Sequence, residues 1–300
     1  VASLGRPMRY RFGTALWAMI ARPPAEPADR GEMFRHDPWS RALGDLGLAL
    51  LNVLDGAPAA AEPELERVHA EFARLGERWG TAQALDWLAV IASWRGDWAR
   101  AWRLWHEALA LLEELGALDE LADVLNRRAT ALRRSGDVAA ARADCERLSG
   151  LERRLGRPEL TAAVRLQLGE IARQEGDLDA AERLLSAART GAESGAFTSV
   201  GMRAHVLTAL GRLAEARGEA ERAAARHAEA VATALASPMA ADLADAAEGL
   251  AGVTVAGLLE NGSPGEDPPR DGGPGHGVRR GEPPAASRRA PGGGPGESGA

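Results

Sequence analysis

The chain has 300 residues, a formal net charge of -7 and a sequence pI near 5.5. This balance argues against a domain that binds nucleic acid by itself, because such domains carry a basic face and a high pI. The only cysteine, Cys145, excludes an internal disulfide and a multi-cysteine zinc site and fits a reducing cytoplasm. A large share of Ala, Leu and Arg beside only 4% aromatic residues favours helices.

Residues 1–36 are expected to contain a helix over 1–21 and then a proline-rich link. The apolar run Ala15 to Ala21 follows several arginines, but it is too short to span a bilayer. Arg22 and two prolines come directly after it, and no clean cleavage site does, so a secretory signal is disfavoured. The sequence therefore predicts a cytoplasmic protein with no membrane partner.

From Asp37-Pro38, where Asp is expected to cap a helix and Pro to occupy its first position, the chain becomes repetitive. Seven glycines are spaced 20 residues apart, and two more follow after gaps of 19 and 23 residues. The positions are Gly56, Gly76, Gly96, Gly116, Gly136, Gly156, Gly176, Gly195 and Gly218. A glycine at each of these points, with helical patterning between, predicts helices that end at glycine C-caps.

Two kinds of turn alternate, Gly-Asp or Gly-Glu and Leu-Gly, so the repeating unit is a pair of helices of about 40 residues. Small residues stand at fixed positions in it, which lets the paired helices approach closely. Five residues after the hairpin turn are Ala61, Ala101, Ala141, Ala181 and Ala223, and seven before it are Ala49, Ala89, Ala129, Gly169 and Gly211. The pattern predicts an all-α, TPR-like (tetratricopeptide-like) α-solenoid of about five to six helical hairpins over residues 37–257. HEAT-type packing is the nearest competitor on the length of the period.

The last predicted helix follows Ser237-Pro238 and ends near Gly257, where no partner helix follows. One apolar side of that helix is then left uncovered. Residues 258–300 are expected to be a disordered tail, because 261–300 contain 12 Gly and 8 Pro. The abrupt change in composition indicates either a native tail or a shifted reading frame, and we favour the second.

The segment Asp37-Pro38-Trp39-Ser40-Arg41-Ala42, together with Trp87 and Trp94-Arg95-Gly96-Asp97, resembles the C-terminal TPR region of actinobacterial SARP-type transcriptional regulators. Those regulators carry a bacterial transcriptional activator domain (BTAD), and the resemblance covers about residues 37–257. In that family a DNA-binding winged helix, the activator domain and often a nucleotide-binding switch precede the repeats. This chain shows no Gly-x-x-x-x-Gly-Lys-Ser/Thr loop and no lysine at all. The resemblance therefore implies the sensor or interaction module of a regulator, without its own DNA-binding or nucleotide-binding domain.

The first helices of such hairpins line a groove, and the repeat register places a set of polar and aromatic side chains there. The predicted peptide-binding residues are Asp86, Trp94, Asn126, Thr130, Arg133, Glu170, Arg173, His205 and Arg212. Gln83, Val90, Asp123 and Thr208 fall on the same face, and Leu43, Leu46, Leu50 and Val53 form an apolar wall at its N-terminal end. Such a groove suits an extended or helical peptide with an acidic end. The competing interpretations are that the polar residues are ordinary solvated side chains and that the four apolar ones pack against the helix over 1–21.

Other chemically suggestive residues favour structural roles. Trp98, Trp102 and Trp105 share one helix face, which indicates core packing or, less simply, an aromatic contact patch. The six histidines show no metal-ligand spacing, and His227 is expected to be a packed or surface residue. Cys145 falls at a core position and is expected to be a buried, inert thiol. Since no nucleophile and base come together in the sequence, neither an enzyme nor a cofactor or metal site is predicted.

The function expected from the sequence is binding of a protein or peptide partner, with no direct contact to nucleic acid. In the first hypothesis the chain is the interaction module of a transcriptional regulator. In the second it is a free-standing TPR adaptor or scaffold protein. Both hypotheses leave open whether copies of the chain form a homo-oligomer.

Overall fold

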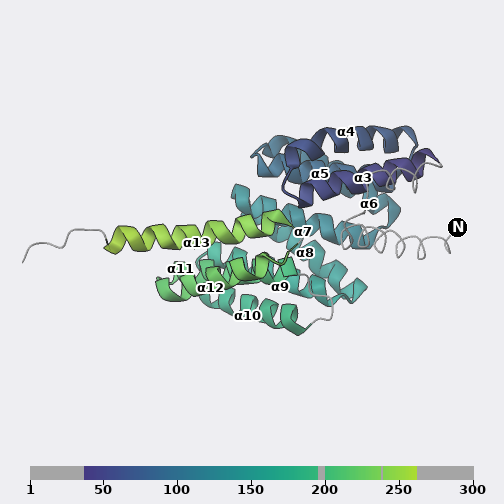
Figure 1. The fold of residues 1–300 in the computed structure, drawn as a ribbon. Coiled ribbons are helices and arrows are strands. Elements are labelled where there is room, and N and C mark those ends of the chain that lie inside the picture. Colours follow the sequence, from purple (N-terminus) through teal and green to yellow (C-terminus); the bar gives the residue numbers. More distant parts are fainter. Residues whose placement is uncertain (1–36, 195–199, 238, 262–300) are drawn as a thin grey trace, which may run out of the picture. The chain divides into compact units, whose positions relative to one another are not determined.

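The structure is a computed structural model that describes residues 37–194, 200–237 and 239–261, all within one compact unit (Figure 1). The described residues form helices and no strand. In chain order the helices are α3 (Pro38–Leu54), α4 (Pro58–Arg74), α5 (Arg78–Trp94), α6 (Trp98–Leu115), α7 (Leu118–Ser135), α8 (Val138–Leu155), α9 (Pro158–Gln174), α10 (Leu178–Ser194), α11 (Val200–Ala216), α12 (Ala220–Ala234) and α13 (Ala240–Asn261).

Consecutive helices pack as hairpins: α3 with α4, α5 with α6, α7 with α8, α9 with α10 and α11 with α12. We call α3, α5, α7, α9, α11 and α13 the first helices and the remaining five the second helices. Each first helix also contacts the next first helix, so successive hairpins stack in one direction, and α13 packs on both α11 and α12. The predicted all-α, TPR-like helical-repeat fold is therefore confirmed, with five complete hairpins and a sixth first helix.

The turns form where the glycine pattern predicts them. Gly96 and Gly136, for example, have φ values of 76° and 92°, which an L-residue with a side chain adopts only under strain. The aspartate after each opens the next helix: the Asp97 carboxylate accepts a hydrogen bond from the backbone N–H of Arg100, and Asp137 does the same for Ala140. Six more of the predicted turn glycines also have positive φ, and Gly195 lies outside the described residues.

The two registers of small residues lie where paired helices touch. All five predicted second-helix alanines, Ala61, Ala101, Ala141, Ala181 and Ala223, are fully buried. On the first helices, a Cβ added to Gly169 would lie 2.8 Å from Cγ of Leu185, and one added to Gly211 would lie 2.5 Å from Cε1 of His227. Real Cβ atoms do not approach this closely, so the glycines leave room for the large side chains of the partner helix.

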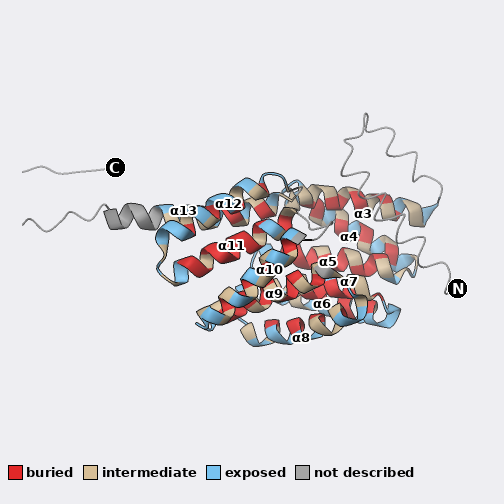
Figure 2. Cartoon of the chain, turned by 90° about the horizontal axis from the view of Figure 1, so that it is seen from below, coloured by how far each residue is buried: buried red, intermediate tan, exposed pale blue. Residues whose placement is uncertain are grey.

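Buried residues concentrate on the helix faces that meet inside the stack, as Figure 2 shows. The tryptophan series belongs to this interior: Trp105 is fully buried, and the Trp98 and Trp102 rings stack 5.7 Å apart against the same cluster. The structure therefore favours core packing over a contact patch for these rings. Cys145 is buried as predicted, and burial, followed by the charge of Asp144, raises the pKa of its thiol to about 11. His227 is a packed residue with no exposed surface.

The ends of the repeat array differ from the prediction in one detail. Helix α13 continues to Asn261, four residues beyond the predicted end at Gly257, because a glycine inside a helix costs only about 1 kcal/mol and leucines follow it. The start of α3 is as predicted, with Asp37 accepting a hydrogen bond from the Ser40 backbone N–H at 2.9 Å. The predictions for residues 1–36 and for the tail after Asn261 lie outside the described residues. None of the described helices is long and apolar enough to cross a bilayer.

Candidate functional site

A continuous series of polar contacts links five successive first helices, α5, α7, α9, α11 and α13. We call this series the first-helix ladder. Its members are Asp86, Asn126, Arg127, Thr130, Arg133, Gln167, Glu170, Arg173, His205, Arg212, Asp242 and Asp245. Eight of the nine residues predicted to line a peptide groove belong to this ladder. Only Trp94 stands apart.

The ladder begins at the buried carboxylate of Asp86 in α5. The indole N–H of Trp105 donates a hydrogen bond to its Oδ1 at 2.9 Å, and the guanidinium of Arg127 in α7 donates to Oδ2. Arg127 also lies over the ring of Trp87, 5.1 Å from the ring centroid. A carboxylate without exposed surface is costly unless it is paired, and here both of its oxygens are satisfied from neighbouring elements.

Neutral side chains continue the ladder from α7 to α9. The amide nitrogen of Gln167 donates to Oδ1 of Asn126 at 3.1 Å and to the Thr130 hydroxyl at 2.6 Å. Gln167 is itself buried, so these two bonds replace the water that its amide would otherwise bind. Asn126 and Thr130 therefore join adjacent repeats and are only partly accessible from outside.

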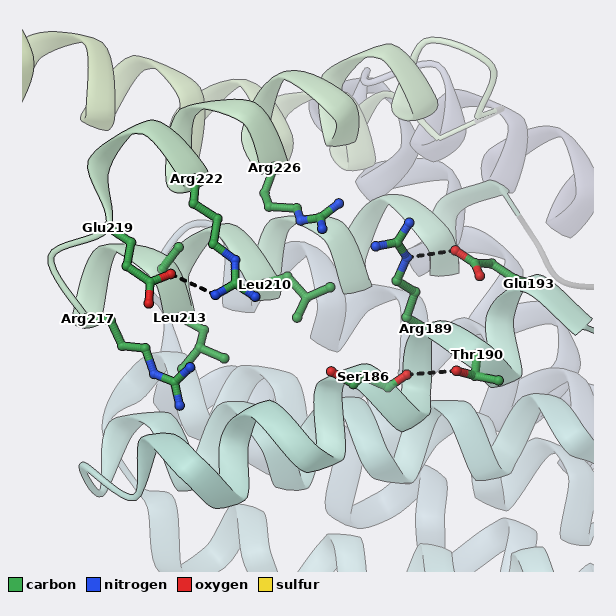
Figure 3. A pocket seen from close by; sticks show the side chains of 11 residues that line it. Ser186, Arg189, Thr190, Glu193, Leu210, Leu213, Arg217, Glu219, Arg222 and Arg226 are labelled. Atoms are coloured by element: carbon green, nitrogen blue, oxygen red, sulfur yellow. Dashed lines mark hydrogen bonds and ion pairs between the residues drawn. The ribbon is translucent and has the colours of Figure 1, made fainter.

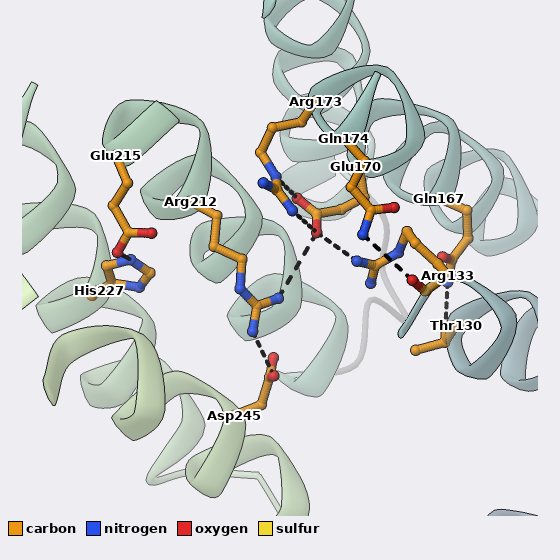
Figure 4. Close-up of polar contacts among 10 residues, drawn as sticks. All are labelled: Thr130, Arg133, Gln167, Glu170, Arg173, Gln174, Arg212, Glu215, His227 and Asp245. Carbon is orange, nitrogen blue, oxygen red and sulfur yellow. Dashed lines mark hydrogen bonds and ion pairs between the residues drawn. The ribbon is translucent and has the colours of Figure 1, made fainter. Parts of the chain in front are cut away.

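The centre of the ladder is the carboxylate of Glu170, whose side chain is 2% exposed (Figure 4). Arg133 of α7 donates to its Oε2 at 2.8 Å, and Arg173, one helical turn along α9, donates to its Oε1 at 3.0 Å. Arg212 of α11 lies 3.9 Å from the same carboxylate and bonds Asp245 of α13 at 2.7 Å. One buried anion thus holds cations from three consecutive repeats.

The last part of the ladder joins α11 to α13 through His205 and Asp242, whose Nε2 and Oδ1 atoms are 3.1 Å apart. Burial lowers the pKa of His205, but the hydrogen bond and charge of Asp242 outweigh it, so the pKa lies above the ordinary value. Burial likewise raises the pKa of Asp242, and the contacts with His205 and Ser237 bring it below the ordinary value. The two groups stabilise each other's charged forms.

The electrostatic environment varies along the face. The protein around the Asp123 carboxyl displaces part of its water and raises its pKa above the ordinary value, and the charge of Arg127 only partly offsets this. Burial lowers the pKa of Arg133, and the charges of Arg212 and Arg173 lower it further. The charge of Glu170 raises this pKa but only partly compensates. An additional carboxylate near Arg133 would therefore be attracted, and so would a proton or a cation near Asp123.

The structure corrects part of the predicted groove. Leu46, Leu50 and Val53 are buried in the core shared by α3, α4 and α5, so they form no exposed apolar wall. Asp86 and Glu170 lie on the predicted face but are buried, because the next first helix covers them. The predicted residues that keep accessible surface are Trp94, at 38% exposed, and the partly exposed Asn126, Thr130, Arg133, Arg173, His205 and Arg212.

Four ladder residues, Arg127, Gln167, Asp242 and Asp245, were not among the predicted site residues. The repeat itself carried a signal for two of them, because Trp87, Arg127 and Gln167 follow one another at intervals of 40 residues on the first helices. Asp242 and Asp245 had no such signal, since they lie on α13, the last of the described helices. Across the described residues, no three His, Cys, Asp or Glu side chains come together as metal ligands.

Comparison with known proteins adds little beyond the fold. No family model matches the chain, and no curated protein matches it. Among solved structures, the chain is similar to one described as "Crystal structure of BtubC (BKLC) from P. vanneervenii", with 19% sequence identity and a TM-score of 0.46 over 74% of this chain and 96% of that one. A similarity at this level carries no argument about function.

Proposed function

We propose that the chain is a protein-binding or peptide-binding helical-repeat module that recognises its partner on the accessible side of the first helices, where Trp94, Arg133, Arg173 and Arg212 lie. We call this side the first-helix face. The observation that carries the proposal is the set of partly exposed charged side chains there, held in place by buried partners. Arg133, Arg173 and Arg212 converge on Glu170, so their remaining N–H groups are fixed in position before a partner arrives. Pre-positioned arginines suit recognition of carboxylates, since little conformational entropy is lost on binding.

The biological setting that we propose is the sensor or interaction module of a transcriptional regulator of the SARP type. Support comes from the sequence resemblance described above. The alternative is a free-standing adaptor with the same kind of partner. Sequencing the native transcript separates the two: a winged helix and an activator domain in frame upstream of Val1 support the regulator, and a stop codon followed by a start at Val1 supports the adaptor.

The binding function can be tested by affinity capture from native cell extract with two matched double variants. The first, Trp94→Ala with Arg173→Ala, removes one aromatic and one arginine from the first-helix face. The second, Leu115→Ala with Arg142→Ala, removes one large apolar residue and one arginine from second helices, where Leu115 is 39% exposed and Arg142 is half-exposed. We expect a partner retained by the wild type and by the second variant to be lost from the first.

Arg173→Ala leaves Glu170 paired with Arg133, so the first variant is expected to fold, and circular dichroism checks this. Equal retention of the partner by both folded variants would place binding elsewhere on the molecule. Absence of any stoichiometric partner for the wild-type chain in extracts from several growth conditions would contradict the proposed function itself.

A further inference from the structure

A groove lies between the second helices α10 and α12, over residues of the first helix α11 that line it from below. It consists of two pockets of about 310 and 230 Å³ that share Arg189 and Glu193 and therefore adjoin. We call the two together the α10–α12 groove. Along α12 it extends from Glu219 to Ala236, beyond both ends of a 15-residue helix.

The residues that line this groove include more arginines than carboxylates, and two of the arginines, Arg217 and Arg222, also pair with Glu182 beside it. Its lining contains five arginines and three glutamates, whereas the full sequence has a formal net charge of -7. The arginines are Arg189, Arg203, Arg217, Arg222 and Arg226. A local excess of cations in a concave site attracts anionic groups more strongly than the same charges on an open surface.

Figure 3 shows how these side chains are directed. Arg189 of α10 and Arg226 of α12 extend toward one another across the first pocket, and Arg222 and Arg217 lie at its other end. Leu210 and Leu213 of α11 form the floor beneath them. The carboxylate of Glu229 lies between these two guanidinium groups, 2.6 Å from Arg226 and 3.7 Å from Arg189, so the pocket already holds one carboxylate where its arginines converge.

The existing partners of these arginines are easily exchanged. Arg226 pairs with Glu229 at 2.6 Å and Arg189 with Glu193 at 2.7 Å, each along its own helix, and Arg189 also lies 3.7 Å from Glu229 of α12. All four side chains are partly exposed to solvent. Exposed ion pairs of this kind contribute little to stability. Carboxylates of a bound segment can therefore replace them without disturbing the fold.

The second pocket has a different character. Val200, Val206, Leu207, Ala232 and Ala236 contribute to its lining, with the charged residues Arg203 and Glu229 at its sides. The groove thus changes from arginine-rich to predominantly aliphatic along its length. A ligand that fills both pockets needs acidic groups at one end and apolar groups at the other.

The facing arginines are specific to this pair of helices. The residues at the repeat position of Arg189 in the other second helices are His69, Leu109, Ser149 and Val231, and those at the position of Arg226 are Glu64, Leu104, Asp144 and Leu184. By contrast, Arg217 and Arg222 have counterparts: Arg95 and Arg100 both pair with Glu62 of α4, as Arg217 and Arg222 both pair with Glu182 of α10. Bridging pairs of that second kind recur along the array, whereas the contacts of Glu229 with Arg189 and Arg226 use two arginines that the other second helices lack at those positions.

We propose that the α10–α12 groove binds a short extended segment of a partner protein in which acidic residues are followed by apolar ones. A helix of 15 residues is about 22 Å long, which an extended peptide of about seven residues spans. The site goes beyond the proposed function, because it uses second helices and shares no residue with the first-helix ladder.

The test uses the full chain and a fluorescein-labelled peptide, Glu-Asp-Glu-Gly-Leu-Val-Leu, in a fluorescence anisotropy titration. The comparison peptide replaces its three acidic residues by lysine. We expect the acidic peptide to bind and the lysine peptide not to, with affinity falling as salt is raised from about 50 to 300 mM because part of the attraction is screened. Arg189→Gln with Arg226→Gln should weaken binding by about tenfold or more, since two charge-assisted contacts are lost.

The matched control is Arg95→Gln with Arg100→Gln, which also removes two arginines that pair with one glutamate of a neighbouring repeat. It should bind the acidic peptide as the wild type does. Ala232→Glu, on the exposed side of α12, should block binding while leaving helicity unchanged.

The proposal is overturned if the wild type binds neither peptide, if it binds both equally, or if the Arg95 and Arg100 control loses as much affinity. Displacement of the acidic peptide by millimolar inorganic phosphate would instead identify a simple anion site. Retained binding in the Trp94 and Arg173 variant distinguishes this groove from the first-helix site.

Discussion

The carboxylate of Glu170 shows how one residue connects several repeats. It is buried and accepts hydrogen bonds from Arg133 and Arg173, with Arg212 at 3.9 Å. Removing water from so many charges is costly, and only their mutual pairing offsets that cost. Because the pairs bridge α7, α9 and α11, they fix how successive hairpins are placed and position the arginines on the first-helix face.

Glu170→Ala is expected to lower the free energy of unfolding by about 3–5 kcal/mol, because it removes the buried anion and leaves the guanidinium groups of Arg133 and Arg173 facing one another. Urea denaturation followed by circular dichroism measures the change. The control is Glu175→Ala on the same stretch of chain, where a half-exposed carboxylate pairs with Arg142; its loss should cost less than about 1 kcal/mol. Equal effects of the two substitutions would show that the ladder does not stabilise the stack.

His205 and Asp242 make a second residue-scale prediction, about pH. The pKa of His205 is raised above its ordinary value of 6.5 in the folded protein, in a setting that also includes Asp245 and Arg212. A group with a raised folded pKa contributes stability fully below its unfolded pKa and loses it as pH rises through the folded pKa. Asp242, with a lowered pKa, contributes above 3.8 and loses its contribution as pH falls through its folded value.

The melting temperature of His205→Gln should therefore lie furthest below that of the wild type near pH 5.5 and approach it above the folded pKa of His205. Thermal melts of both proteins between pH 5.5 and 8.5 check this. The effect is expected to be modest, because the His205 side chain is 43% exposed and solvent screens the pair. A difference between the two proteins that does not change with pH would mean that His205 acts only through packing.

At the scale of elements, the close approach of helices depends on residues that lack bulk. The ring of His227 in α12 lies between Gly211 of α11 and Gly249 of α13: added Cβ atoms would be 2.5 and 2.4 Å from its Cε1. Its Nε2 atom is 2.9 Å from Oε1 of Glu215, at the end of α11. Three helices thus meet around one imidazole, and the two glycines determine how closely α11 and α13 can approach α12.

Gly211→Ala should destabilise the protein by about 1–3 kcal/mol, because the new methyl group overlaps the His227 ring and forces the helices apart. Gly150→Ala in α8 is the matched control, since a Cβ there would meet nothing within 4 Å. In that position alanine favours the helix by about 0.5–1 kcal/mol over glycine. Chemical denaturation of both variants measures the two effects, and the prediction is that they have opposite signs.

At the scale of the whole molecule, stability is distributed between neighbours in the stack. Each described helix contacts mainly the helices next to it in sequence and the first helix of the adjoining repeat. In such an array, stability is close to a sum of repeat and interface contributions, and the terminal elements cover the apolar faces of those inside. Helix α13 has this role for α11 and α12, to which it adds Asp242, Asp245 and Gly249.

A chain that ends after Ser237, and so lacks α13, should unfold at a lower temperature than a chain that ends after Asn261. It exposes His227 and leaves His205 and Arg212 without their α13 carboxylates. Most of the helical signal should remain, because the first four hairpins keep their own interfaces. Thermal melts followed by far-UV circular dichroism compare the two chains, and identical midpoints would show that α13 contributes nothing to the stack.

The sequence by itself determined the helices, the turns and the order of pairing. These follow from local rules: glycine at positions with positive φ, aspartate at helix starts, and small residues at a fixed distance from each turn. Because the repeat fixes which helix faces meet, the burial of Ala89 and Ala101 on those faces could also be predicted. The sequence likewise placed the candidate site residues on the first helices.

Only the tertiary structure decided what those residues do. Whether Glu170 faces solvent or three arginines depends on the distance and angle between repeats, which no residue in α9 encodes alone. The same holds for Leu46. The repeat register placed this residue on the groove, but it packs against α4 and α5 and is buried. The α10–α12 groove arises in the same way: Arg189 and Arg226 are 37 positions apart in the sequence, and they face each other only because two hairpins stack side by side.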